Sequence, residues 1–356
     1  MRIKIWFYDW PFFFALVLLM VAGLVNQMSA GGQALFLRQS LWMGGGLLLF
    51  SVFWWLDYHK ILTFQRILGL YLGFLGLLLF MALQHKRWVY FGGFSLQPSE
   101  FAKPLIVALL ASLFSENREE IISPSLLGIS LALVLIPVLL IAVTDLDQAF
   151  LLLVIAATVI LFAGISKRIL IGILILGMMS FLVIGPLVWK QLKPYQKARL
   201  EAFLKPGKTH KRWSYQTRQA LIALGSGGLT GQGFKQGLSS KLHYLPAKHT
   251  DLAFAVWGEE WGFVGSMVVV SLFALLIGCN LKAAYSAKDM LGRFLAFGCG
   301  ATLFWEVFFN LAGVVRLLPA ASLPLPFLSY GGSSVFANMI MLGFAASVMR
   351  RRFSFL

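Results

Sequence analysis

Charged side chains of this 356-residue chain lie in or beside long apolar runs, where they could bind a charged substrate. Glu100 and Lys103 are three residues apart in the segment 97–104, a spacing that lets them pair on one helix face. Because a charge inside hydrocarbon is costly, each such residue is a candidate for a functional site. The alternative for this pair is a helix-start ion pair without a function. Arg87 and Trp88 lie just before this segment.

Two further candidates are acids next to apolar runs. Asp145 lies in the short polar segment 144–148, which by itself fits an ordinary turn. Asp251 follows Thr250, a good helix N-cap, so Asp251 would lie in the first turn of a helix, where the dipole favours a carboxylate. Capping and the helix dipole alone would explain an acid at position 251, without any function. Asp251 is nevertheless the acid nearest to a strongly basic segment, where an anionic substrate would collect.

The last polar cluster is the Pro- and Gly-rich segment 324–334, which leads into the final apolar run and contains Ser329 and Ser333. Prolines and glycines at membrane depth indicate a re-entrant or broken element, because irregular backbone is tolerated there only where it lines a cavity or is buried in protein. Another glycine cluster, 225–233, follows no strand and lacks the Gly-Lys-Ser/Thr of a phosphate-binding loop. We interpret the cluster 225–233 as a flexible hinge.

The elements that position these residues are predicted from composition and hydropathy. The chain is 59% hydrophobic and 12% charged, whereas a soluble domain carries about 25% charged residues. Most of its surface must therefore face lipid. We predict one integral membrane domain, residues 1–356, that is an all-α polytopic membrane protein. Its ten transmembrane helices are expected at about 10–28, 39–55, 64–83, 100–114, 125–143, 149–165, 169–189, 256–281, 292–315 and 331–349.

The distribution of Lys and Arg predicts the orientation. Thirteen lie near the ends of the spans on one side, and the short loops of the other side carry four, namely Arg38, Lys86, Arg87 and Arg316. The positive-inside rule makes the first side cytoplasmic, with both termini there. A signal peptide is the alternative for the first run, although Met28-Ser29-Ala30 is a poor cleavage site.

The large extracytoplasmic loop between helices 7 and 8, about 190–250, carries twelve basic residues and one acid, Glu201. It either lies against anionic lipid headgroups or collects an anionic substrate at the outer leaflet. The five histidines and two cysteines form no metal-binding spacing, so no protein-built metal site is expected.

Six segments with unusual residues occur in one order along the chain: Arg87-Trp88, 97–103, 193–196, 225–233, 246–251 with Glu259-Glu260, and 323–334. Together these segments resemble the SEDS family (shape, elongation, division and sporulation proteins). They run from the third predicted span to the last, and some variants resemble the rod-shape branch more than the division branch. The match is weaker at 143–148, where only Asp145 fits the family pattern, and at Arg316.

The resemblance implies a peptidoglycan glycosyltransferase in the inner membrane of a bacterium. Such a protein polymerises lipid II into β-1,4 glycan during cell elongation, with a class B penicillin-binding protein and other elongation machinery as partners. Asp251 matches the important aspartate of the family. No nucleic acid partner is expected, and membrane lipid surrounds the chain.

Inverting displacement of an α-linked diphosphate needs a base and a cationic site for the leaving group. We assign Asp251 as the base, and Arg87, Lys103 and Lys193 as candidates to bind the diphosphate. Glu100, Trp88, Asp145, Ser329 and Ser333 complete the expected substrate site. No cofactor is certain, although a divalent cation, magnesium or manganese, could assist the diphosphate.

Two other functions fit the same sequence. A lipid II flippase would also need intramembrane charges and a broken helix, but it would need no general base. A non-catalytic scaffold for the transpeptidase would tolerate replacement of the cavity charges.

Overall fold

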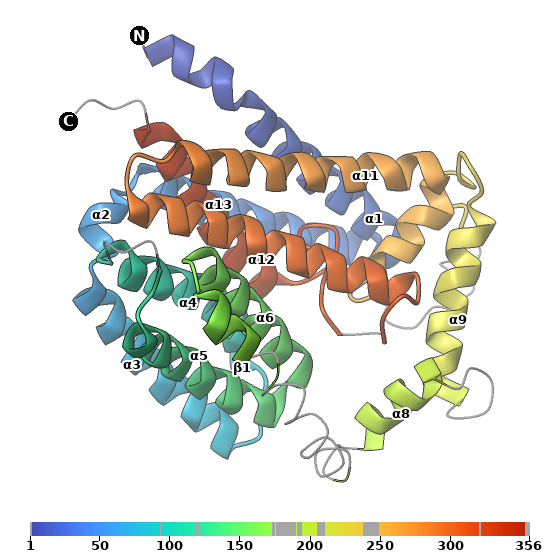
Figure 1. The fold of residues 1–356 in the computed structure, drawn as a ribbon. Helices are drawn as coiled ribbons and strands as arrows, with labels where there is room; N and C mark the ends of the chain where they lie inside the picture. The colour runs from blue at the N-terminus through green and yellow to red at the C-terminus, as the bar shows by residue number, and fades with distance from the viewer. Residues whose placement is uncertain are drawn as a thin grey trace.

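The computed structural model describes residues 2–92, 94–117, 121–172, 175, 190, 194–204, 211–237, 249–319 and 322–352. These residues are predominantly helical, as the sequence predicts (Figure 1). The only sheet among them is an antiparallel hairpin of β1 (Val89–Phe91) and β2 (Phe94–Leu96). The helices are α1 (Arg2–Trp55), α2 (Tyr58–Ile61), α3 (Phe64–Leu83), α4 (Pro98–Ser115), α5 (Pro124–Thr144), α6 (Leu146–Phe162), α8 (Pro194–Leu204), α9 (Lys211–Ser226), α11 (Ala253–Ser286), α12 (Met290–Val314) and α13 (Gly332–Arg351).

Within the described ranges, seven helices are long and apolar enough to cross a membrane. Helix α3 has the predicted bounds, and α4, α5, α12 and α13 begin and end within a few residues of theirs. Helix α6 is apolar but has 17 residues. Most of the predicted seventh span, 169–189, lies outside the described residues, as do 191–193, 205–210 and 238–248 of the predicted long loop.

Helix α1 is a hairpin of two antiparallel halves rather than one rod. The backbone leaves the helical region at Gly32, with φ 72° and ψ −167°. The ring of Phe12 then stacks on that of Phe50 with centroids 6.4 Å apart, and Phe13 lies 5.4 Å from Trp54. The two halves therefore correspond to the first two predicted spans. The second half returns beside α13 (Figure 1).

Helix α11 is also broken, at Gly262, where φ is 66° and ψ is −163°. Its first regular residue is Ala253, and its N-cap is Leu252, which makes no side-chain capping bond. The prediction that Thr250 is the N-cap is therefore wrong. The Thr250 carbonyl accepts a hydrogen bond from Ser329 instead, and Asp251 lies in a turn before the helix.

Helices α4, α12 and α13 form the centre of the molecule. In the apolar stretches of α13 and α4, 89% and 78% of the residues are buried, whereas 28% are buried in the apolar stretch of α3. Helix α4 packs against both α12 and α13, so the polar residues that it carries lie in the interior. Exposed leucines on α3, such as Leu70 and Leu83, lie on the outside, where lipid would contact them.

Candidate active site

Residues from distant parts of the sequence meet at one cavity of about 220 Å³. Six of the nine predicted site residues line this central cavity: Arg87, Trp88, Glu100, Asp145, Asp251 and Ser333. They come from the β1 side of the hairpin, the start of α4, the α5–α6 turn, the turn before α11 and the start of α13. The other lining residues are Gln97, Thr250, Ser322, Pro324, Tyr330, Gly331 and Ser334.

The turn that carries Asp251 is fixed by an amide side chain of α12. Asn310 Nδ2 donates to the Asp251 carbonyl at 3.1 Å and to the Leu323 carbonyl at 2.7 Å. Asn310 is buried in an apolar span, where an unsatisfied amide would be costly. The one side chain therefore joins the Asp251 turn to the Pro-rich segment before α13.

A second amide, Gln27 on α1, makes a similar connection from the opposite side. Its Nε2 donates to the His249 carbonyl at 3.0 Å and to the Leu328 carbonyl at 2.8 Å. The backbone N–H of Tyr330 also donates to the His249 carbonyl, at 2.7 Å. Because α1, α12 and the Pro-rich segment all hold this turn, Asp251 has a fixed place in the cavity.

Arg87 and Asp145 both line the central cavity, and this pair is its polar wall. Arg87 Nη1 lies 3.6 Å from Asp145 Oδ2, and Arg87 Nε donates to the Thr144 carbonyl at 2.5 Å. Gln97 Nε2 donates to the same Asp145 oxygen at 3.2 Å. Burial raises the pKa of Asp145, and the Arg87 charge opposes this shift.

Asp145 also has a structural role, because it is the N-cap of α6. Its Oδ1 accepts from the Gln148 backbone N–H at 3.3 Å. Asp145 therefore belongs to an ordinary polar turn, 144–148, and also lines the candidate site. The adjacent Asp147 accepts from the Ser322 N–H at 2.9 Å and so fixes the segment that contributes Pro324.

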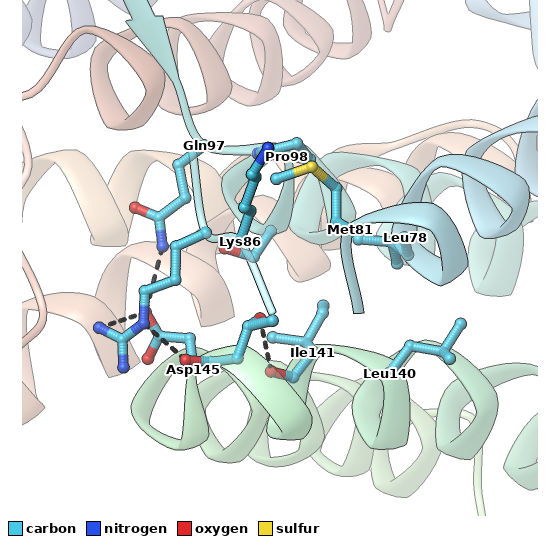
Figure 2. Close-up of a pocket in the computed structure, with 11 residues that line it drawn as sticks. Leu78, Met81, Lys86, Gln97, Pro98, Leu140, Ile141 and Asp145 are labelled. Carbon is cyan, nitrogen blue, oxygen red and sulfur yellow. Dashed lines mark hydrogen bonds and ion pairs between the residues drawn. The ribbon is translucent and has the colours of Figure 1, made fainter. Parts of the chain in front are cut away.

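Behind this wall lies a cavity of about 10 Å³, which is large enough for one water molecule (Figure 2). It shares Arg87, Gln97 and Asp145 with the central cavity, and the apolar side chains of α3 and α5 close it. Lys86 also lines it. The polar wall is therefore the boundary between the central cavity and the packed α3–α5 contact.

A buried charge network forms the floor of the central cavity. Lys103 Nζ lies 2.6 Å from Glu100 Oε2 and also pairs with Glu306 Oε1 of α12. Gln148 Nε2 donates to the other Glu100 oxygen at 2.5 Å. The i,i+3 pair is thus present, as the spacing predicts. Only Glu100 of these residues reaches the cavity surface.

Lys103 is not among the residues that line the central cavity, and its side chain is 2% exposed. Two carboxylates already neutralise its charge. The structure therefore places Lys103 as a support for Glu100, below the surface that a diphosphate would contact. Sequence reasoning missed Glu306, although an acid inside the apolar run 292–315 was a sufficient signal.

The two predicted serines differ in their surroundings. Ser333 lines the cavity, and its Oγ accepts from the Gln97 N–H at 2.8 Å. Ser329 is buried, where its Oγ donates to the Thr250 carbonyl at 2.6 Å and accepts from the Leu325 N–H at 2.8 Å. Ser329 therefore holds backbone beneath the site. Lys193 lies outside the described residues.

A metal ion held by protein ligands alone does not fit this part of the chain. Among the described residues, no group of three or more His, Cys, Asp or Glu side chains is close enough to share an ion. Glu100 and Asp145 line the cavity but already have cationic and amide partners. A divalent ion would have to take most of its ligands from a substrate diphosphate.

Known proteins resemble the chain over nearly its whole length. A family model of cell cycle proteins, named for FtsW, RodA and SpoVE, matches residues 2–353. The peptidoglycan glycosyltransferase MrdB of Escherichia coli is 38% identical over 271 residues, which cover 75% of this chain and 71% of MrdB. The probable peptidoglycan glycosyltransferase FtsW of a Geobacter species is 36% identical over 323 residues, 88% of this chain and 86% of that protein.

Solved structures agree with this result. The crystal structure of the rod shape determining protein RodA of Thermus thermophilus has 26% identity and a TM-score of 0.67, covering 97% of this chain and 98% of RodA. A chain from a peptidoglycan synthase complex that coordinates polymerization and crosslinking has 26% identity, a TM-score of 0.77 and the same coverage. This chain therefore belongs to the FtsW/RodA/SpoVE family of cell cycle proteins.

Proposed function

We propose that the chain is a peptidoglycan glycosyltransferase that polymerises lipid II into β-1,4 glycan with inversion at the donor sugar. The observation that carries this proposal is the presence of Asp251 and Arg87 on one polar cavity, between helices that lipid would surround. Relatives in the same family are named peptidoglycan glycosyltransferases. A base and an anion-binding side chain in one cavity are the two groups that this displacement needs.

In the proposed reaction, Asp251 accepts the proton of the acceptor sugar's 4-hydroxyl while the oxygen attacks C1 of the donor. The C1–oxygen bond to the diphosphate breaks, and undecaprenyl diphosphate leaves with the electron pair. Arg87 stabilises the negative charge that develops on the leaving group, because its planar guanidinium can donate to two oxygens at once. Asp145 and Thr144 orient Arg87 for this contact.

Glu100 acts as a fixed part of the cavity floor rather than as a second base. Both of its oxygens have partners, Lys103 on one side and Gln148 on the other. Trp88 and Ser333 are the lining residues that we assign to the sugar portion. Side chains held in one rotamer by such partners keep reacting groups in place with little reorganisation.

We also propose the finer features of topology. The chain has ten transmembrane helices in the bacterial inner membrane, with the span 169–189 as the seventh and both termini in the cytoplasm. Arg350 and Arg351 in the last turn of α13, on the predicted cytoplasmic side, support this orientation. The cavity then opens at the outer face, where lipid II is polymerised.

The proposed partner is a class B penicillin-binding protein, which would cross-link the new strand. The similarity to a chain of a synthase complex that couples polymerization to crosslinking supports this partner. We assign the chain to cell elongation, where it would act with the elongation machinery, because its sequence variants resemble those of the rod-shape branch. Named relatives include both MrdB and FtsW. The assignment is tested by depleting the chain in a rod-shaped host and asking whether elongation or division fails.

The decisive experiment uses the purified chain with lipid II, with and without its penicillin-binding partner. Asp251→Asn should lower the rate of glycan formation at least about 100-fold, since general-base catalysis contributes about that much. Asp147→Asn is the matched control, because Asp147 does not line the cavity and an amide oxygen can still accept from Ser322. Normal glycan from Asp251→Asn would refute the proposed base.

The same preparations distinguish a glycosyltransferase from a lipid II flippase. Reconstituted vesicles with labelled lipid II report flipping independently of polymerisation. A chain that flips lipid II and forms no glycan under any of these conditions would be a transporter, and the glycosyltransferase proposal would be wrong.

A further inference from the structure

The glycine cluster 225–233 packs tightly against the break in α11 and does not form the flexible hinge that its composition predicts. Two N–H groups of the cluster donate to the last carbonyls before the break: Gln232 to Glu259 at 3.0 Å and Gly233 to Glu260 at 3.0 Å. A helix that ends at Gly262 leaves such carbonyls without partners in its own ladder. The cluster therefore completes the C-terminal end of the short first part of α11.

The same cluster completes the other side of the break. The N–H of Phe263 donates to the Gly228 carbonyl at 2.9 Å, and the N–H of Val264 donates to the Leu229 carbonyl at 3.0 Å. These are the first N–H groups of the long second part of α11. Four backbone hydrogen bonds thus join one turn to both ends of a broken helix, in a span where unpaired backbone groups are costly.

This arrangement requires glycines. A Cβ on Gly227 would overlap the Gly258 carbonyl oxygen, and a Cβ on Gly231 would overlap the Glu260 carbonyl oxygen. At the break itself, Gly262 has a positive φ, and a Cβ there would overlap the backbone of Gly231. The two backbones are in direct contact, so neither can shift without moving the other.

The first part of α11, 253–261, is the rod that follows Asp251. At one end it adjoins the turn that Asn310 holds, and at the other it is joined to the glycine cluster. Trp257 Nε1 also donates across the break to the Gly265 carbonyl at 3.0 Å. The angle between the two parts of α11, visible in Figure 1, therefore sets where the Asp251 turn lies.

We propose that residues 227–233 of this cluster are a positioning element for catalysis, which holds the broken α11 so that Asp251 reaches the acceptor hydroxyl. The inference rests on the proposed role of Asp251 as base. Gly227 and Gly231 are positioning residues, because neither lines the central cavity and both act through the backbone of residues 258–262. Arg87 and Ser333 line the cavity from segments other than the glycine cluster, so we expect substrate binding by these residues to be retained when the cluster is disturbed.

The test compares Gly227→Ala with Gly225→Ala in the purified full chain. A Cβ on Gly225 meets nothing within 4 Å, so this variant is the matched control. Displacement of reacting groups by about 1 Å can lower a rate about 100-fold. Gly227→Ala should therefore lower kcat by about 10- to 100-fold with an unchanged KM for lipid II, while Gly225→Ala keeps both values.

Hydrogen exchange provides a readout of the break itself. The amides of Phe263 and Val264 should exchange faster in Gly227→Ala than in Gly225→Ala, because their acceptors lie in the displaced turn. Equal exchange together with wild-type kcat would overturn the inference. An unchanged kcat with a raised KM would also overturn it, since that result would place the cluster in substrate binding.

A second variant covers the case in which Gly227→Ala does not fold. Gly228→Ala puts a side chain at a φ of 54° where a Cβ meets nothing within 4 Å, so it strains the turn that accepts from Phe263 without a clash, and a smaller fall in kcat with constant KM is expected. Wild-type kcat in that variant would overturn the inference. An active Asp251→Asn would instead defeat the proposed function, so the two failures are distinguishable.

Discussion

The charge network below the cavity predicts an asymmetry between two substitutions. Lys103 pairs with both Glu100 and Glu306, and all three side chains are buried. Lys103→Met leaves two carboxylates without their cation in the interior. Removal of one partner from a buried ion pair costs about 3–5 kcal/mol. We expect Lys103→Met to lose about that much of the free energy of unfolding.

Glu306→Gln should behave differently, because it leaves Lys103 paired with Glu100 at 2.6 Å. The remaining network has one positive and one negative charge, and the glutamine oxygen can still accept from Lys103. The expected cost is about 0.5–1.5 kcal/mol, the net contribution of an ordinary hydrogen bond. The predicted order of stability is therefore wild type, then Glu306→Gln, then Lys103→Met by a wide margin.

The assay is denaturant or thermal unfolding of the purified chain in one detergent, followed by intrinsic tryptophan fluorescence. The double variant Lys103→Met with Glu306→Gln is the internal control, since it removes one of the two stranded carboxylates and should recover part of the loss. Equal stability of Lys103→Met and Glu306→Gln would refute the reasoning, because it would mean that the lysine does not compensate two buried charges.

Two other predictions concern the walls of the cavity. Burial raises the pKa of Asp145, so the folded state binds a proton at this carboxyl more readily than the unfolded state does. The free energy of unfolding should therefore fall as pH rises from about 4 through the raised pKa. In Asp145→Asn, the free energy of unfolding should change less with pH across that range. Asn310→Ala leaves the Asp251 and Leu323 carbonyls without their donor and should cost about 1–3 kcal/mol in the same unfolding assay. Asn280→Ala is its control, because Asn280 bonds only to the carbonyl four residues earlier in its own helix, and an equal loss in both variants would contradict the role of Asn310.

Hydropathy was sufficient to predict most of the helices. The run 64–83 became α3 with the same bounds, because a long apolar segment in lipid satisfies its backbone only as a helix. The break at Gly32 lies between the first two predicted spans, 10–28 and 39–55, so the sequence indicated it. The break at Gly262 was not predicted, because this glycine lies inside the single apolar run 256–281 and nothing in the composition of that run distinguishes it from the other glycines.

The site was predicted better than its supports. Charges inside or beside apolar runs indicated Glu100, Asp145 and Asp251, and the structure brings these three to one cavity. The partner of each buried group depends on packing between distant helices. Lys103 and Glu306 are 203 positions apart in the sequence, so no local pattern could pair them. For the same reason, the sequence could not indicate that Lys103 has a second carboxylate partner.

The central cavity has lining residues as far apart as Arg87 and Ser334 of the 356-residue chain. One wall thus comes from α13, which is synthesised after the helices that carry Glu100 and Asp145. A partly synthesised chain can hold Glu100 and Asp145 in the membrane, but it lacks Ser333 and the Pro-rich segment that fixes the Asp251 turn. Glycan synthesis by such a protein would begin only after α13 has been made, and a chain that terminates before α13 would be inert toward the lipid-linked precursor.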